Sequence, residues 1–268
     1  MITSHTALYG VFGDPVSHSL SPLMHNAAFA HIGYDAAYLA FRIRDIRAAI
    51  SAMKALFMKG ASITIPHKIS VMEYLDDIDD MARNIGAVNT IINRDGRLSG
   101  YNSDWLGAMR ALKEKTEICG KSVGIIGAGG AARAIGFGVR KEGGKAVIIN
   151  RSVNKGESLA KDIGAEFIPL SEISTSDCRI IINTTPLGMT PNMDTTPIPK
   201  DMLHNDMTIM DIVYNPLKTR LLKEAEEQGC KIIDGLSMFI YQGAFQSELW
   251  TGKPAPIELM RDVVKQYL

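Results

Sequence analysis

Lys121-Ser-Val-Gly-Ile-Ile-Gly-Ala-Gly-Gly-Ala-Ala132 joins a hydrophobic run to a glycine-rich turn in the middle of the chain. The run predicts a buried strand, and the alanine-rich residues after the turn predict a helix. Gly127, Gly129 and Ala132 form the pattern G-x-G-x-x-A. The first glycine permits a tight turn, the second lets the backbone approach a pyrophosphate, and the small third residue lets the helix pack on the strand. This context predicts dinucleotide binding at the helix N-terminus, and a purely structural glycine turn is the alternative.

The end of the next predicted strand distinguishes between the two nicotinamide cofactors. Residues 146–150 read Ala-Val-Ile-Ile-Asn and are followed by Arg151 and Ser152, with Lys155 one helical turn further on. NAD sites usually carry a carboxylate at this position, where it accepts hydrogen bonds from the ribose hydroxyls. No carboxylate is present here, and a guanidinium can bind a 2′-phosphate through two charge-assisted hydrogen bonds. The segment therefore predicts NADP as the cofactor, and a surface arginine that only caps the strand is the alternative.

Short β-branched runs alternate with segments of helical length along the chain, which predicts an α/β fold built on parallel sheets with helices on both faces. The predicted strands are residues 7–11, 37–41, 62–65, 88–92, 122–126, 146–150, 179–182, 208–212 and 231–233. The predicted helices include residues 21–32, 46–55, 131–142, 155–163 and 218–228.

The glycine-rich turn begins a dinucleotide-binding unit well inside the chain, so about a hundred residues precede it, enough for a separate α/β layer. We therefore expect two domains. Residues 1–103 form an N-terminal α/β substrate-binding and catalytic domain, and residues 104–237 form a Rossmann-type domain that binds NADP. The C-terminal helices, residues 238–268, are expected to rejoin the first domain.

The composition argues against several classes of partner. Lys plus Arg and Asp plus Glu number 29 each, so net charge offers no reason to expect a nucleic-acid partner. Cys119, Cys178 and Cys230 form no C-x-x-C pair, and the six histidines form no H-E-x-x-H motif, so no metal is expected. With no secretory signal and no apolar run that could cross a bilayer, we expect a cytoplasmic protein without a membrane partner. The protein is expected to be a monomer or a homodimer.

A polar loop near the N-terminus carries candidate ligand-binding hydroxyls. Residues 13–22 read Gly-Asp-Pro-Val-Ser-His-Ser-Leu-Ser-Pro. Ser19 and Ser21 flank one apolar residue, so in an extended loop both hydroxyls can point the same way and bind a small polar ligand. The alternative is that Ser21 and Pro22 are only the N-cap and first residue of a helix.

Three further segments place polar groups at predicted strand ends. Thr64 and Lys68 follow one predicted strand, at the position where α/β proteins usually bind ligands. Asn89 lies in Gly-Ala-Val-Asn-Thr, residues 86–90, and Asp104 follows Asn-Ser. Each has an ordinary alternative: a solvated lysine, a strand start and a helix cap, respectively.

Taken together, these segments resemble the shikimate dehydrogenase family over nearly the whole chain. The shared motifs, in family order, are H-S-L-S-P-x-M-H-N, T-x-P-x-K, G-A-V-N-T, Y-N-x-D-x-x-G, G-A-G-G-A-A, N-R-S, Asn-Thr-Thr-Pro-Leu-Gly-Met (183–189), Val-Tyr-Asn-Pro (213–216) and Asp-Gly-Leu-Ser-Met (234–238), with Gln242 and Trp250. Two positions depart from the family pattern. Ser62 stands where the family usually has Asn, and Ser103 where it usually has Thr.

The resemblance implies a role for each matching residue. Lys68 and Asp104 are the implied catalytic pair. The implied substrate-binding residues are Ser19, Ser21, Thr64, Asn89, Tyr214 and Gln242. The cofactor-binding residues are Gly127, Ala128, Gly129, Gly130 and Ala131 of the turn, Asn150, Arg151, Ser152 and Lys155 at the adenosine phosphate, and Thr184, Leu187, Gly235 and Met238 on the nicotinamide side. The resemblance also supports the return of the C-terminal helices to the first domain.

The activity that the resemblance implies is the reversible reduction of 3-dehydroshikimate to shikimate by NADPH, in aromatic amino acid biosynthesis. Hydride addition to a ketone creates negative charge on oxygen, which a nearby ammonium can stabilise and protonate. A quinate/shikimate dehydrogenase with relaxed substrate or cofactor use is the nearest alternative. A catalytically silent binding protein on the same fold is a second, which the presence of both Lys68 and Asp104 disfavours.

Overall fold

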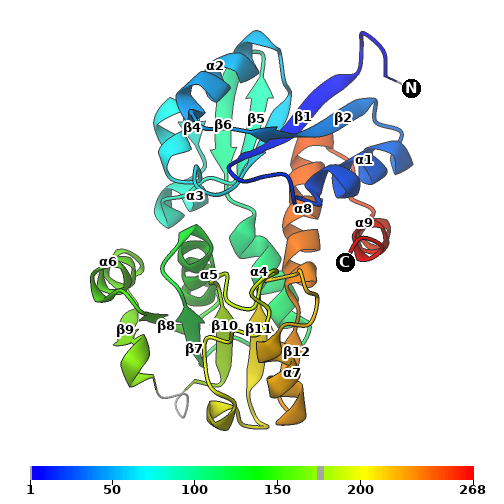
Figure 1. Cartoon of the computed structure of the whole chain (residues 1–268). Helices are drawn as coiled ribbons and strands as arrows, with labels where there is room; N and C mark the ends of the chain where they lie inside the picture. The colour runs from blue at the N-terminus through cyan, green and yellow to red at the C-terminus, as the bar shows by residue number, and fades with distance from the viewer. Residues whose placement is uncertain (1, 174–177) are drawn as a thin grey trace. The chain divides into compact units, whose positions relative to one another are not determined.

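The chain consists of two compact α/β units, each built on one six-stranded sheet (Figure 1). The structure is a computed structural model that describes residues 2–173 and 178–268. The first unit comprises the chain up to Ser103 together with Gln242–Tyr267, and the second comprises Asp104–Tyr241. The predicted α/β fold class is confirmed.

The sheet of the first unit has the strand order β2-β1-β3-β5-β6-β4. Its strands are β1 (Ala7–Gly13), β2 (Ala36–Arg42), β3 (Gly60–Ile63), β4 (Asp77–Ile78), β5 (Thr90–Arg94) and β6 (Arg97–Tyr101). Its helices are α1 (Ser21–His31), α2 (Ile46–Ala55), the short 3₁₀ helix η1 (Ser70–Tyr74), α3 (Asp80–Ile85), α9 (Ile257–Lys265) and the part of α8 (Gly235–Thr251) that follows Tyr241.

This sheet is mixed, so the expectation of a wholly parallel sheet is wrong for the first unit. β5 runs antiparallel to both β3 and β6. The cause is a tight hairpin in which Arg94 pairs with Arg97, leaving Asp95 and Gly96 as the connecting residues. Both have positive φ, 51° and 91°, as a two-residue turn between twisted strands requires. Asp-Gly is a recognised hairpin signal, but the hydrophobic pattern alone does not indicate strand direction.

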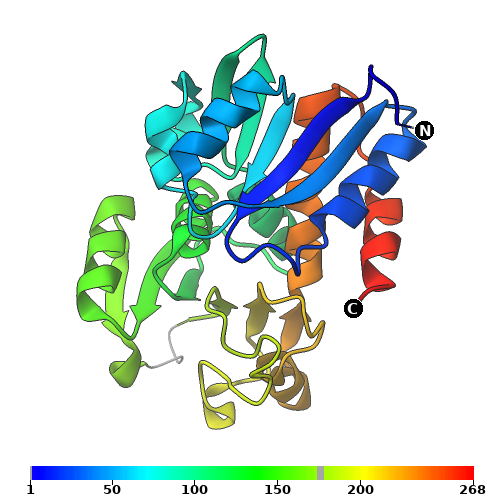
Figure 2. The same ribbon diagram turned by 45° about the horizontal axis from the view of Figure 1, so that its top comes forward.

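The two faces of this sheet bury different side chains, because successive residues of a strand point to opposite sides. Tyr9 and Val11 of β1 pack with Trp250 of α8 on one face. Phe12 packs with Met53 of α2 on the other. Helix α1 covers the first face and lies beside α9, as Figures 1 and 2 both show.

The second unit contains a wholly parallel sheet in the order β12-β11-β10-β7-β8-β9, as the sequence predicts. Its strands are β7 (Ser122–Ile126), β8 (Lys145–Asn150), β9 (Glu166–Pro169), β10 (Ile180–Asn183), β11 (Thr208–Asp211) and β12 (Lys231–Ile233). Its helices are α4 (Asp104–Lys113), α5 (Gly130–Lys141), α6 (Val153–Ile163), α7 (Arg220–Glu227), the beginning of α8, and the 3₁₀ turns η2 (Leu170–Glu172) and η3 (Lys200–Met202).

Helices cover both faces of the second sheet. Leu222 of α7 packs on the face that carries Ile126 and Ile149. Gly136 of α5 faces the opposite side of the sheet, where an added Cβ would be in ordinary van der Waals contact with Ile125 at 3.5 Å. On one side of β7 lie β8 and then β9. On its other side lie β10, β11 and β12, which come later in the chain. The strand order therefore reverses between β7 and β10, the point where open α/β sheets bind ligands.

His25 of α1 is a buried histidine in the aromatic core of the first unit. Its ring stacks on Tyr38 with centroids 4.5 Å apart, and the Trp250 ring lies 5.1 Å away. Neither ring nitrogen has a hydrogen-bond partner of normal geometry among the described residues. Burial lowers the pKa of His25 to about 3, and the Gln246 side chain offsets only part of this effect. The folded protein therefore holds this imidazole neutral at pH values where an unfolded chain would protonate it.

We expect His25→Phe to weaken the pH dependence of stability. As the pH falls from about 6 to about 4, the unfolded chain takes up a proton at this residue and the folded chain does not, which costs about 1.4 kcal/mol of unfolding free energy per pH unit. Urea unfolding of both proteins between these pH values measures the difference. His31→Gln, at an exposed histidine of the same helix, is the control. Parallel stability curves for wild type and His25→Phe would contradict the assignment.

Candidate functional site

One edge of the first sheet collects the predicted substrate-binding residues that belong to the first unit. The loop that carries Ser19 follows the carboxyl end of β1, and Thr64 follows the carboxyl end of β3. Ser103 and Asp104 follow the carboxyl end of β6. Because β5 is antiparallel, its amino end, preceded by Asn89, lies at this same edge. Polar residues from four strand ends are thereby brought together.

Backbone hydrogen bonds fix the loops at this edge to one another. The Asp14 N–H donates to the Ile65 carbonyl at 3.0 Å, which ties the loop after β1 to the loop after β3. The Val88 N–H donates to the Lys68 carbonyl at 2.8 Å. Lys68 is half-buried. The backbone of Lys68, the predicted catalytic lysine, is therefore bonded to Val88, the residue that precedes Asn89.

Asn89, Ser103 and Gln242 form a hydrogen-bonded group at the same edge. The Asn89 Nδ2 donates to Ser103 Oγ at 2.9 Å, and its Oδ1 accepts from the Ser103 N–H at 2.8 Å. The Ser103 hydroxyl lies 3.4 Å from Gln242 Oε1. Asp104, the next residue, begins α4 and is only 5% exposed. The serine that replaces the usual family threonine thus links two predicted substrate-binding residues.

The structure excludes helix capping as the role of Ser21. Ser21 is the first residue of α1, Leu20 occupies the N-cap, and no side chain caps this helix. Instead, the Ser21 N–H donates to Ser19 Oγ at 3.3 Å. Burial raises the pKa of the Tyr38 phenol, and the hydroxyls of Ser62 and Ser21 offset part of this rise, which places Ser21 beside the buried polar interior. Ligand binding by Ser19 and Ser21 stays a prediction.

The glycine turn of the second unit leaves its backbone open at Gly129. Gly127 has a φ of 122°, and an added Cβ would lie 2.4 Å from Thr184 Oγ1. Gly129 is exposed, with a φ of −93°, and an added Cβ would meet no atom within 4 Å. The protein's own packing therefore does not require glycine at position 129, whereas a diphosphate against this backbone would. Ala132 is fully buried where α5 packs on the sheet.

The other predicted turn residues, Ala128, Gly130 and Ala131, are half-buried around the start of α5. At the end of β8, Asn150 Nδ2 donates to the Ser152 carbonyl at 2.9 Å, which bends the chain sharply after the strand. Arg151, Ser152 and Lys155 are exposed beyond this bend. The geometry leaves the arginine and lysine cations accessible to a phosphate, and phosphate binding stays a prediction.

Thr184 lies directly against the glycine turn. Its hydroxyl donates to the Ile126 carbonyl at 2.6 Å, so the residue after β10 meets the residue that ends β7. These two strands flank the point where strand order reverses. Leu187, further along the same loop, is half-buried. The predicted nicotinamide-side residues Thr184 and Leu187 thus lie on the loop that follows β10.

The remaining predicted residues cluster around the start of α8. Gly235 lies so close to the residues after β11 that an added Cβ would be 2.4 Å from the Ile212 carbonyl oxygen, so protein packing is enough to explain this glycine. Met238 is buried. The Tyr214 ring stacks on Phe239 with centroids 4.7 Å apart, and burial raises the pKa of its phenol.

Asp211 is a structurally important residue that the sequence analysis missed. Asn183 Nδ2 and the Val213 N–H donate to its Oδ1, both at 3.0 Å, and the Thr219 hydroxyl donates to its Oδ2 at 2.7 Å. Burial raises the pKa of Asp211 to about 6, although all three hydrogen bonds favour the ionised form. This carboxylate fixes the loops that carry Thr184, Leu187 and Tyr214. The only sequence signal is a carboxylate at a strand end.

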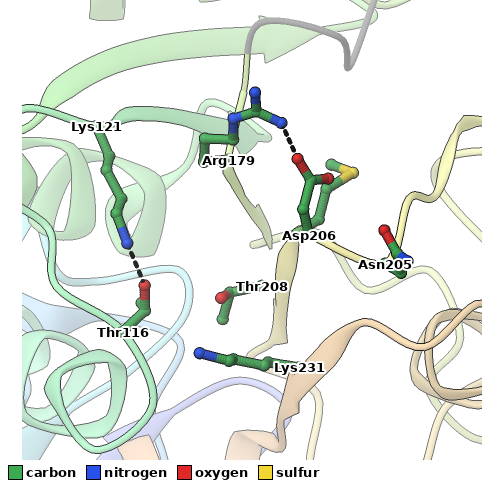
Figure 3. A pocket seen from close by; sticks show the side chains of 8 residues that line it. Thr116, Lys121, Arg179, Asn205, Asp206, Thr208 and Lys231 are labelled. Carbon is green, nitrogen blue, oxygen red and sulfur yellow. Dashed lines mark hydrogen bonds and ion pairs between the residues drawn. The ribbon is translucent and has the colours of Figure 1, made fainter.

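A hollow of about 510 Å³ in the second unit is not the predicted cofactor site. It lies at the amino ends of β7, β10, β11 and β12, and its lining includes Lys121, Arg179 and Lys231 (Figure 3). Arg179 pairs with Asp206, and Lys121 donates to Thr116 Oγ1 at 2.8 Å. The glycine turn follows the opposite, carboxyl end of β7. None of the predicted site residues lines this hollow.

Two further properties concern the described part of the chain. Within residues 2–173 and 178–268, no three His, Cys, Asp or Glu side chains gather as a metal site would require. Among the helices in those same residues, none is both long and apolar enough to cross a membrane.

The strand order of the second unit, with a glycine turn at its reversal point, defines a Rossmann-type dinucleotide-binding fold joined to a second α/β unit. Residues 11–91 match the shikimate dehydrogenase substrate binding domain, and residues 235–265 match the shikimate 5′-dehydrogenase C-terminal domain. The NADP(+) shikimate dehydrogenase of Methanocaldococcus jannaschii is 46% identical over 277 residues, which cover 98% of each chain. The chain belongs to the shikimate dehydrogenase family.

Several solved structures are similar to this chain in fold over 97% or more of its length. A shikimate dehydrogenase in complex with NADP+ matches with a TM-score of 0.95 and 44% identity, covering 100% of this chain and 97% of that one. The Thermus thermophilus enzyme, in complex with NADP(H) and shikimate, matches with a TM-score of 0.92 and 32% identity over 98% and 100% of the two chains. A quinate dehydrogenase from Corynebacterium glutamicum in complex with NAD is also similar, at 28% identity and a TM-score of 0.90 over 97% and 99%.

We expect Asp211→Ala to lower the free energy of unfolding by about 2–4 kcal/mol, because three buried donors lose their acceptor. Asp211→Asn keeps one acceptor oxygen and should cost less. Chemical unfolding at pH 7.5 measures both. Asp206→Ala, which removes an exposed carboxylate paired with Arg179, is the matched control and should cost less than about 1 kcal/mol. If Asp211→Ala is no more destabilising than this control, the bracing role is wrong.

Proposed function

We propose that this chain catalyses the reversible, NADP-dependent interconversion of 3-dehydroshikimate and shikimate, a step of aromatic amino acid biosynthesis. The observation that carries the proposal is the group Asn89–Ser103–Gln242 at the sheet edge where Lys68 is anchored. Family membership and the glycine turn at the reversal point of the second sheet support it further. In this proposal the protein is an oxidoreductase acting on a CH-OH group.

Substrate binding is assigned to the polar edge of the first unit. Ser19, Ser21 and Thr64 offer hydroxyls, while Asn89 and Gln242 offer amides, a set suited to a small molecule with one carboxylate and several hydroxyl groups. Tyr214 is proposed to contact the same ligand. A substrate held by many hydrogen bonds is discriminated strongly from analogues that lack one of them, because a buried partner would be left unpaired.

Lys68 and Asp104 are assigned to the chemistry. NADPH, when bound, supplies the hydride. The Lys68 ammonium stabilises the negative charge that develops on the carbonyl oxygen and donates the proton that completes the hydroxyl group. Asp104 orients the lysine and accepts a hydrogen bond from the product hydroxyl. In the oxidation of shikimate the same step runs in reverse, and the Lys68 amine accepts the proton of the hydroxyl group.

The cofactor assignment rests on the two strand ends of the second unit. The turn from Gly127 to Ala131 would hold the diphosphate, and exposed Gly129 gives it room. Asn150, Arg151, Ser152 and Lys155 would hold the 2′-phosphate. Thr184, Leu187, Gly235 and Met238 would contact the nicotinamide side.

The alternative of relaxed specificity is decided by one assay. The quinate dehydrogenase among the structural neighbours makes quinate a reasonable second substrate. Reduced cofactor formation is measured with shikimate and with quinate, each with NADP and with NAD. We expect shikimate with NADP to give the highest kcat/KM. Absence of shikimate oxidation would contradict the proposal. The cytoplasmic location, the lack of nucleic-acid and membrane partners, and a monomeric or homodimeric state also stay predictions.

We expect Arg151→Ala to raise the KM for NADP by about 10- to 100-fold and to change the KM for NAD much less. The reason is the loss of charge-assisted hydrogen bonds, worth about 1.5–3 kcal/mol, to a phosphate that NAD lacks. Steady-state kinetics with both cofactors measures the effect. Lys161→Ala removes an exposed cation from α6 without touching the predicted site and is the control. Equal effects of Arg151→Ala on both cofactors would argue against a 2′-phosphate contact.

We expect Lys68→Ala to reduce kcat by about 10²–10⁴-fold, the usual contribution of general acid–base catalysis, with NADP binding nearly intact. Turnover and the Kd for NADP are measured separately. Lys59→Ala, at an exposed lysine of the same unit, is the matched control and should keep normal turnover. Near-normal turnover in Lys68→Ala would show that this mechanism is wrong.

A further inference from the structure

A series of buried hydrogen bonds runs through the first unit and ends at Asn89. The Tyr38 hydroxyl donates to Ser62 Oγ at 2.6 Å, and the Ser62 hydroxyl donates to Gln246 Oε1 at 2.8 Å. Gln246 Nε2 then donates to Thr90 Oγ1 at 2.9 Å, and the Thr90 hydroxyl donates to Asn89 Oδ1 at 2.7 Å. All five side chains are at most 7% exposed. We call this set, Tyr38–Ser62–Gln246–Thr90–Asn89, the buried series.

Every proton in the buried series points in the same direction. Each hydroxyl has one proton, so Thr90 can donate to Asn89 only if it accepts from Gln246. Gln246 suits the central position because an amide accepts at one end and donates at the other. Its Nε2 also lies 3.3 Å from the Asn89 carbonyl oxygen, which adds a second contact to the same residue.

The buried series determines how the Asn89 amide is oriented. Asn89 Oδ1 accepts from both the Thr90 hydroxyl and the Ser103 N–H. A flipped amide would place its NH₂ group against the Ser103 N–H, which can only donate, and two donors do not pair with each other. The orientation of the Asn89 amide is therefore fixed, with its Nδ2 directed at the Ser103 hydroxyl. That hydroxyl lies beside Gln242.

We propose that Gln246 and Thr90 are positioning residues for substrate recognition: they hold the Asn89 amide, and through Ser103 the Gln242 amide, in the orientation that binds the substrate. The inference rests on the proposed function and assigns roles to residues outside the predicted site. Ser62 and Tyr38 complete the set by holding the acceptor end of Gln246. Ser62, which replaces the usual family asparagine, is short enough to bond to both neighbours.

Two matched pairs of variants test the proposal. Thr90→Val keeps the shape and removes the hydroxyl, and Thr90→Ser keeps the hydroxyl. Gln246→Leu removes the central amide, and Ser247→Ala removes the neighbouring buried hydroxyl of α8, which has no hydrogen-bond partner among the described residues. The KM for shikimate, the KM for NADP, kcat and the thermal midpoint are measured for each.

Thr90→Val and Gln246→Leu are expected to raise the KM for shikimate about five- to twentyfold, as loss of one well-oriented hydrogen bond would do. The KM for NADP should stay within about twofold, and Thr90→Ser and Ser247→Ala should resemble wild type. A purely structural role would change both KM values together or lower only the thermal midpoint. That result, or an unchanged shikimate KM, overturns the proposal.

The proposed function and this inference fail in different ways. A wild-type protein that does not oxidise shikimate overturns both, whereas an active wild type whose KM for shikimate is unaffected by Thr90→Val and Gln246→Leu overturns only the inference. If those variants do not fold, Tyr38→Phe removes only the first hydroxyl of the buried series. It should raise the shikimate KM about two- to threefold without changing the KM for NADP, and no change would equally overturn the proposal.

Discussion

The reversed direction of β5 determines which side chains of the first unit can meet. In a wholly parallel sheet only the residues after each strand would share one edge. Here the antiparallel strand brings the residue before it, Asn89, to the carboxyl ends of β3 and β6. The two-residue turn at Asp95 and Gly96 produces this reversal, at the opposite edge of the sheet. A backbone turn at one edge of the sheet therefore determines which polar residues meet at the other edge.

The second unit also brings polar groups together at strand ends, but all its strands are parallel. Its strand order reverses between β7 and β10, so the loops after these strands diverge and leave room for a ligand. Thr184 bonds across this point to the Ile126 carbonyl, and Asp211 braces the loops after β10 and β11. The two units thus place polar groups at strand ends by different topologies, one with a reversed strand and the other with a reversed strand order.

Sequence alone predicts features whose determinants are close together in the chain. The glycine turn lies within twelve consecutive residues, and its strand, turn and helix all occur in the structure. The strands β4, β6 and β9 are not predicted; β4 has only two residues. Asp211 escapes prediction because its partner Asn183 is 28 residues away, and Gln246 because its partner Ser62 is 184 residues away. Such roles follow from tertiary contacts, which hydrophobic periodicity does not encode.

The uniform direction of the buried series has a consequence for the entropy of ligand binding. Hydroxyl rotors and amide flips at a polar surface normally adopt several arrangements, and a ligand that selects one must offset the loss of the others. In this protein the protons between Tyr38 and Asn89 already have one arrangement that satisfies every partner. The fold alone therefore holds the Asn89 amide in one orientation, and a ligand bound at this edge would not have to select it from several.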